Sequence, residues 1–90
     1  MCASIAETLT TRAKELVDRE ARLANRRVGN VSITCSIEWL ALHLEIDRSP
    51  TLIHLRIKPA DALEDLERFD GEVESIARLL LGVSRRGLTP

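Results

Sequence analysis

Two histidines and two cysteines are the side chains of this 90-residue chain best suited to catalysis near neutral pH. His43 and His54 lie in segments where apolar and polar residues alternate, and both occupy the polar positions. No cluster of cysteines or carboxylates accompanies them at the spacing of a metal site, and no glycine-rich elbow frames a serine nucleophile. The sequence therefore predicts no enzyme, no metal site and no cofactor.

The cysteines and the hydropathy pattern indicate the compartment. Cys2 and Cys35 are far apart in the sequence, and no apolar run approaches the length that crosses a bilayer. The N-terminal segment also lacks the pattern of a secretion signal. We therefore expect a cytoplasmic protein with reduced thiols and no membrane partner, in which Cys35 is a small core residue.

Arginines provide the strongest candidate for a binding site. Arg12, Arg19 and Arg26 recur every seven residues beside the apolar face of a predicted helix. Such a row of cations can lie along a phosphate backbone, where each neutralised phosphate adds salt-dependent affinity. The predicted DNA-binding residues, called the arginine stripe below, are Arg12, Arg19, Arg22, Arg26 and Arg27.

The arginine stripe has a second interpretation, in which its members form ion pairs. Glu15, Glu20 or the acidic second helix of a partner subunit can neutralise them, and the chain as a whole has a net charge of −1. DNA binding by so nearly neutral a chain requires a dimer that doubles the stripe. The two interpretations differ in whether the arginines are exposed.

The first predicted element is a helix over residues 4–27. Ser4 and Glu7 form a capping-box pattern at its start, and Gly29-Asn30 is a stop signal after its end. Apolar residues recur at helical spacing between these limits.

Residues 31–58 change to a period of two, which is typical of strands with one buried face. The predicted strands are 31–37, 40–47 and 51–58. Pairing residue 47 with residue 52 places the apolar positions of the last two strands opposite one another. The joint between the first two strands is either a tight turn at Ile37-Glu38 or a bulge in one long strand.

A second helix is predicted over residues 60–81, with Pro59 at its start, Gly82 at its end and either a kink or a split near Asp70-Gly71. The carboxylates between residues 61 and 74 are expected on its solvated outer face. Residues 83–90 are expected to form a frayed tail. The sequence thus predicts one α+β domain over residues 1–90, in the order α-β-β-β-α, with an antiparallel sheet packed by two helices. A core this small favours a homodimer.

Two stretches also resemble parts of a helix-turn-helix. Residues 36–50 match a first helix, a turn and the start of a recognition helix, and residues 75–86 match a first helix and turn. The alternation through Ile57 favours strands for the first of them.

A short strand motif is similar to one in a known family. Val31-Ser32-Ile33-Thr34 and, thirteen residues after Val31, Leu44-Glu45-Ile46-Asp47 resemble the strand pair of the YbaB/EbfC nucleoid-associated family. The family has a glycine in the turn where this chain has Ile37. The resemblance implies a homodimer that binds DNA with little sequence preference.

Two functions are therefore expected from the sequence. The first is a non-enzymatic homodimer that binds the phosphates of duplex DNA through the arginine stripe. The alternative is a small adaptor or inhibitor that engages another protein through a strand edge or the acidic second helix.

Overall fold

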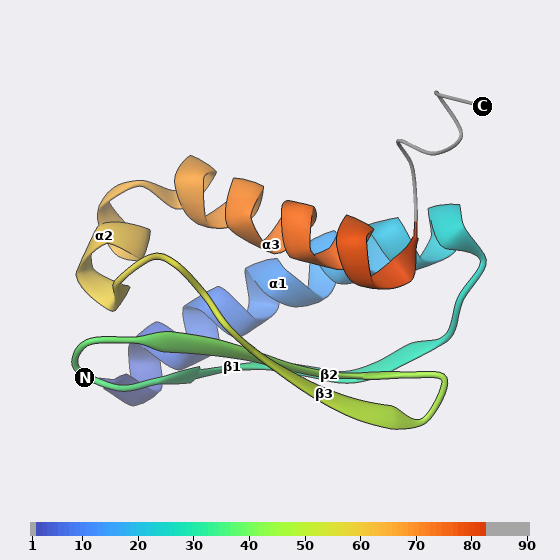
Figure 1. The fold of residues 1–90 in the computed structure, drawn as a ribbon. Helices are drawn as coiled ribbons and strands as arrows, with labels where there is room; N and C mark the ends of the chain where they lie inside the picture. Colours follow the sequence, from blue (N-terminus) through green and yellow to red (C-terminus); the bar gives the residue numbers. More distant parts are fainter. Residues whose placement is uncertain (1, 83–90) are drawn as a thin grey trace.

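The computed structural model describes residues 2–82 and shows a three-stranded antiparallel sheet with helices on one of its faces (Figure 1). The strands lie in the order β1-β2-β3, and α1 packs against both β1 and α3. This arrangement confirms the predicted α+β class. In chain order, the elements are α1 (Cys2–Ala24), β1 (Val28–Cys35), β2 (Leu40–Ile46), β3 (Ser49–His54), α2 (Pro59–Glu64) and α3 (Leu66–Leu81).

The C-terminal end of α1 is fixed by a residue in the left-handed conformation. Asn25 has a φ of 57°, and its N–H donates to Arg22 O at 3.2 Å. Arg26 N–H donates to Ala21 O at 3.0 Å, which completes a Schellman motif. Asparagine tolerates this conformation better than most residues, so the helix ends before the predicted glycine is reached. The helix predicted over about residues 4–27 is thus observed as Cys2–Ala24, which begins two residues earlier and ends three residues earlier than predicted.

A bulge in β1 explains a change in its apolar pattern. The register with β2 shifts between Gly29 and Ser32, so that Asn30 and Val31 together lie opposite Leu44. Asn30 has a φ of 51°, the left-handed conformation of the first residue in a bulge of the G1 type. The extra residue allows Val28 on one side of the bulge and Val31 on the other to contact the same core.

The joint between β1 and β2 is a tight turn, as one of the two predicted alternatives had it. Ser36 N–H donates to Trp39 O at 2.9 Å, and Ile37 and Glu38 form the tip of the turn.

The turn between β2 and β3 is shorter than predicted. Asp47 and Arg48 have φ values of 51° and 73°, which are those of a two-residue type I′ hairpin turn. Ile46 therefore pairs with Ser49, and Leu42 pairs with Ile53. The predicted pairing of residue 47 with residue 52 is wrong, because it leaves four residues (48–51) in the turn where the structure has two. The shift is an even number of residues, so each side chain keeps its predicted face of the sheet.

The second predicted helix is two helices, and they separate at Asp65 rather than at Gly71. Asp65 has φ −134° and ψ 80°, and its side chain accepts a hydrogen bond from Arg68 N–H as the N-cap of α3. Gly71 lies inside α3 on an exposed face, where a glycine costs little packing. Pro59 begins α2 and Gly82, with a φ of 70°, ends α3, as predicted.

The core lies between the sheet and the helices. Its largest fully buried side chains are Phe69, Leu9, Leu40, Leu42, Leu44, Glu20, Val17 and Val73. Cys35 is half-buried at its margin.

Both helix-turn-helix interpretations are wrong where the structure can test them, because residues 36–50 form a turn and strands and residues 75–81 continue α3. The predicted tail at residues 83–90 lies outside the described residues.

None of the helices within residues 2–82 is long and apolar enough to cross a membrane.

Candidate functional site

The first arginine of the stripe is held by α3. Arg12 Nε donates to Asp70 Oδ1 at 2.9 Å and its terminal nitrogen donates to Asp70 Oδ2 at 2.5 Å, a two-point contact between guanidinium and carboxylate. The hydrogen bond to Asp70 raises the pKa of Arg12 above its ordinary value. The geometry fixes α1 against α3 and leaves Arg12 poorly placed to contact a phosphate.

Two further ion pairs cross between α1 and α3. Arg19 contacts Glu74, and in the opposite direction Arg78 Nε lies 3.2 Å from Oε1 of Glu20. Glu20 is completely buried, and within residues 2–82 neither of its carboxylate oxygens receives a well-aligned hydrogen bond. Because a buried carboxylate requires a nearby positive charge, Arg78 is committed to this contact.

These contacts correct part of the expectation that the carboxylates of the second helix lie on a solvated face, since Glu64, Asp65 and Glu67 are exposed as expected but others are not. Asp70 and Glu74 are half-buried and pair with α1, and Glu72 Oε2 accepts a hydrogen bond from Arg56 N–H at 3.0 Å. The acidic face of α3 is therefore used within the fold. The predicted pairing of arginines with an acidic second helix is found within one copy of the chain.

Arg26 is occupied by the turn between β2 and β3. Its Nε and terminal nitrogen lie 3.0 and 2.7 Å from Oδ2 of Asp47, and a third nitrogen lies 3.4 Å from Leu81 O. The hydrogen bond from Arg26 lowers the pKa of Asp47 below its ordinary value of 3.8. The same turn is joined to the end of α1 through Asp47 N–H, which donates to Arg27 O at 2.9 Å.

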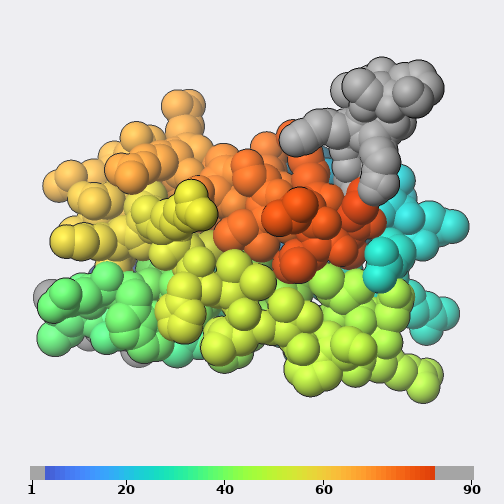
Figure 2. Space-filling model, viewed as in Figure 1, coloured from blue at the N-terminus to red at the C-terminus, as the bar shows by residue number. Residues whose placement is uncertain are grey.

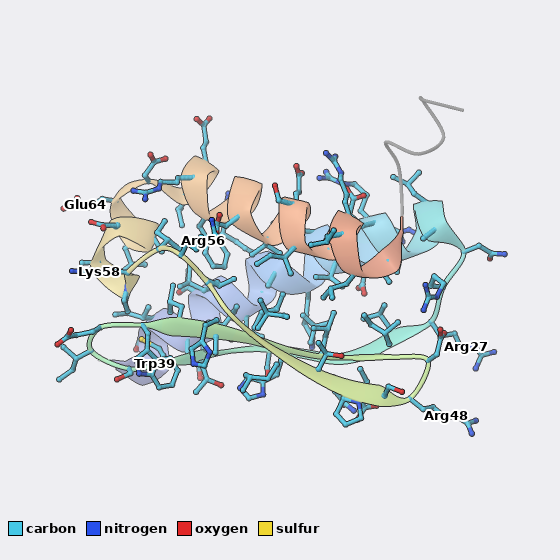
Figure 3. The ribbon with its side chains drawn as sticks, viewed as in Figure 1. Arg27, Trp39, Arg48, Arg56, Lys58 and Glu64 are labelled. Carbon is cyan, nitrogen blue, oxygen red and sulfur yellow. The ribbon has the colours of Figure 1, made fainter. Side chains whose placement is uncertain are left out.

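Arg22 and Arg27 are the stripe residues that remain available. Both are exposed, and neither has an acidic partner among residues 2–82. Arg48, in the type I′ turn, is also exposed and unpaired within that range, although the sequence did not single it out. Figure 3 shows Arg27 and Arg48 at the same end of the molecule.

This basic end consists of the last turn of α1, the segment that follows it and the turn between β2 and β3. It carries four arginines and one acid, an excess of three positive charges, from Arg22, Arg26, Arg27, Arg48 and Asp47. A cluster of guanidinium groups with few acidic neighbours attracts phosphate or another polyanion.

The opposite end of the molecule is acidic. It consists of the turn between β1 and β2, the α2 helix and the first turn of α3, and Figure 3 shows Lys58 and Glu64 there. Five acids outnumber two bases in these segments, namely Glu38, Asp61, Glu64, Asp65 and Glu67 against Lys58 and Arg68. The nearly neutral chain is therefore strongly polarised from end to end.

The histidines lie on the strands without a cluster of metal ligands. His43 pairs with Leu52, and His54 pairs with Ala41, so both side chains project from the face of the sheet opposite the helices. The ring of His54 lies edge-on to Trp39, with 5.4 Å between ring centroids. Within residues 2–82, no three His, Cys, Asp or Glu side chains are grouped as a metal ion would require.

A groove separates the end of β3 from α3. Its volume is about 330 Å³, and it is lined by Ile53, His54, Arg56, Glu72, Ser75, Ile76 and Leu79. The apolar part of this lining includes Leu79, whose side chain is 81% exposed. Figure 2 shows β3 and α3 beside one another at the surface, with no helix over β3 from this side. The residue pattern along the chain does not predict this groove, because the groove depends on how α3 lies relative to the sheet.

The fold thus defines a two-layer α+β protein with helices on one face of a three-stranded antiparallel sheet. Comparison with known proteins finds no family model, no curated protein and no solved structure that matches this chain. The resemblance to the YbaB/EbfC family stays a prediction.

Proposed function

We propose that this protein is a non-enzymatic DNA-binding protein that contacts the phosphates of a duplex through its basic end. The observation that carries the proposal is a set of three exposed arginines without an acidic partner within residues 2–82: Arg22 in the last turn of α1, and Arg27 and Arg48, which lie at the same end of the molecule (Figure 3). Contacts with phosphates are independent of sequence, so we expect little preference among duplexes.

The proposal narrows the arginine stripe to the part that is free to bind. Arg12 and Arg19 hold α3, and Arg26 holds the turn that presents Arg48. We assign these three arginines a structural role. Arg22 and Arg27 keep the binding role predicted for them, and Arg48 joins them.

The salt dependence of binding tests this assignment directly. The affinity for a mixed-sequence duplex, measured by fluorescence anisotropy at several salt concentrations, is expected to fall as salt rises. Each arginine that neutralises a phosphate contributes about 0.9 to the slope of log affinity against log salt. Replacing Arg22, Arg27 and Arg48 together by Gln is therefore expected to lower the slope by between two and three.

The matched control is a double variant, Arg12→Gln with Asp70→Asn, which removes one arginine of the stripe together with its partner. It is expected to bind DNA as the natural chain does, because Arg12 is already neutralised. Absence of binding at low salt, or binding without a salt slope, would contradict the proposal. Equal losses in the triple variant and in the control would contradict the division of the stripe.

The alternative function, an adaptor that binds another protein, had two candidate surfaces. The acidic helix is now the weaker of them, because Asp70, Glu72 and Glu74 are used within the fold. The strand edge that remains is β3.

A further inference from the structure

The outer edge of β3 has unpaired backbone groups over a short and well-defined stretch. Leu55 N–H donates to Leu40 O at 2.9 Å, which fixes the alternation of hydrogen bonds between β2 and β3. By this alternation the backbone groups of Pro50, Leu52 and His54 are directed away from β2. Within residues 2–82, no other element supplies a partner for those of Leu52 and His54.

The stretch is closed at both of its ends. Pro50 has no N–H to offer an incoming strand. Arg56, the next residue of the outward series, has its N–H bound by the carboxylate of Glu72. The edge therefore offers a strand two residues with both donor and acceptor, Leu52 and His54.

This stretch is complementary to a second copy of itself in one register. With Ile53 opposite Ile53 of the second copy, Leu52 faces His54 in an antiparallel ladder, and every outward N–H and C=O of both residues is paired. With Leu52 opposite Leu52, each His54 would face Pro50, which lacks a donor. With His54 opposite His54, each Leu52 would face Arg56, whose donor Glu72 already holds.

The side chains fit the same register. Ile53 pairs with Leu42 and lies on the face of the sheet that carries the helices, beside the groove. The groove is apolar at Ile76 and Leu79, and among its lining residues within 2–82 the positive charge of Arg56 is balanced by the negative charge of Glu72. An Ile53 side chain from a second copy would be placed at this groove, opposite the first Ile53.

Charge complementarity favours a second copy over an unrelated strand. Residues 49–54 contain no Asp, Glu, Lys or Arg, so two copies of the stretch meet without repulsion between formal charges. An antiparallel pairing centred on Ile53 also sets the basic end of each copy alongside the acidic end of the other. A polarised molecule is attracted to its own copy in this orientation.

We infer that the β3 edges of two copies pair antiparallel about Ile53, which joins two three-stranded sheets into one continuous sheet. Leu52, half-exposed at 52%, and Leu79 become covered in this assembly. This pairing does not depend on the proposed DNA binding, so experiments on the protein alone can test it.

Charged substitutions at Ile53, the centre of the proposed interface, give the sharpest test. The natural chain is expected to sediment as a dimer. Ile53→Lys and Ile53→Glu each place like charges opposite one another, so each variant alone is expected to raise the dissociation constant of the dimer about a hundredfold or more. An equal mixture of the two variants is expected to recover the dimer as a heterodimer, because the charges are then opposite.

Two controls keep this test decisive. Thr34→Lys places the same charge on the exposed surface of β1, and this variant is expected to remain a dimer. Should the Ile53 variants fail to fold by circular dichroism, hydrogen exchange of the natural chain decides the matter. The amides of Leu52 and His54 are expected to be protected at high protein concentration and to lose that protection on dilution.

The inference is overturned if the natural chain is a monomer at every concentration, or if Ile53→Lys stays dimeric. It is also overturned if a different protein, rather than a second copy, protects the Leu52 and His54 amides. If the natural chain forms the dimer but binds no DNA, the result contradicts the proposed function and leaves the pairing of the β3 edges standing.

Discussion

The two edges of the sheet are protected in opposite ways. At the β1 edge, Ile33 N–H points away from β2 and donates to the hydroxyl of Thr10 in α1 at 2.9 Å. At the β3 edge, the backbone groups of Leu52 and His54 have no helix to receive them within residues 2–82. We call these the covered edge and the open edge. Within residues 2–82, this small sheet therefore uses one edge to hold its own helix and leaves backbone groups of the other edge unpaired, which is the kind of edge that a further strand can join.

The largest effect on stability is expected at the covered edge. Thr10→Val keeps the shape of the side chain but removes the acceptor for Ile33 N–H. A buried donor left without a partner costs about 1–3 kcal/mol of the free energy of unfolding. Urea unfolding at one fixed protein concentration measures the loss. Thr10→Ser retains the hydroxyl and is expected to lose much less, and Thr8→Val, on the exposed side of α1, serves as the control.

An intermediate effect is expected at the open edge, on association. In the register centred on Ile53, residue 50 lies opposite Arg56 of the second copy, so the N–H that Pro50→Thr supplies faces a C=O there. The variant is therefore expected to tighten the dimer about tenfold, the equivalent of roughly one good hydrogen bond. Sedimentation equilibrium measures the change. Thr51→Val alters a neighbouring side chain without altering the outward donors, and it should leave the dissociation constant within about twofold. If Pro50→Thr weakens the dimer, the open edge does not pair as proposed.

The smallest effect is expected at the turn that leads into the open edge. The hydrogen bond from Arg26 lowers the pKa of Asp47 below 3.8, so the folded state favours the ionised form. Its contribution to stability is complete at pH values above 3.8 and is lost as the pH falls through the lowered pKa.

Asp47→Asn removes this contribution. We expect the variant to be slightly less stable than the natural chain near neutral pH, and the two urea midpoints to converge in strong acid. Asp18→Asn, an exposed aspartate outside the ion pairs described above, is the control. A difference between the natural chain and Asp47→Asn that persists unchanged in acid would show that the carboxylate charge is not what stabilises the turn.

The sequence is sufficient for the kind and order of most elements, because apolar periodicity records which side of each element is buried. It is insufficient for the hairpin register, since Asp47 and Arg48 adopt the left-handed conformation without a glycine to signal it. The break at Asp65 was missed for a related reason. Asp-Gly at residues 70–71 is a stronger local signal for a break than a capping aspartate in an acidic run.

The candidate site was less predictable than the fold. Arg12 and Arg22 lie on the same helix, and the sequence does not distinguish their roles. They differ in availability because α3 places Asp70 against Arg12, whereas no acid within residues 2–82 pairs with Arg22. Such a difference arises from the packing of helices that are distant along the chain, which periodicity does not encode. Arg48 lay outside the predicted site because that site was drawn from arginines along the first helix, and only the fold brings the turn between β2 and β3 beside the segment that follows α1.

The contact between Trp39 and His54 has a practical consequence. Trp39 is the sole tryptophan of the chain, and its ring lies against a residue of the open edge. Its fluorescence emission therefore originates at one place on the surface and is sensitive to what covers that place. Titrating the unlabelled protein from dilute to concentrated solution should shift the emission as the edge is buried, which gives an optical reading of the assembly without any added dye.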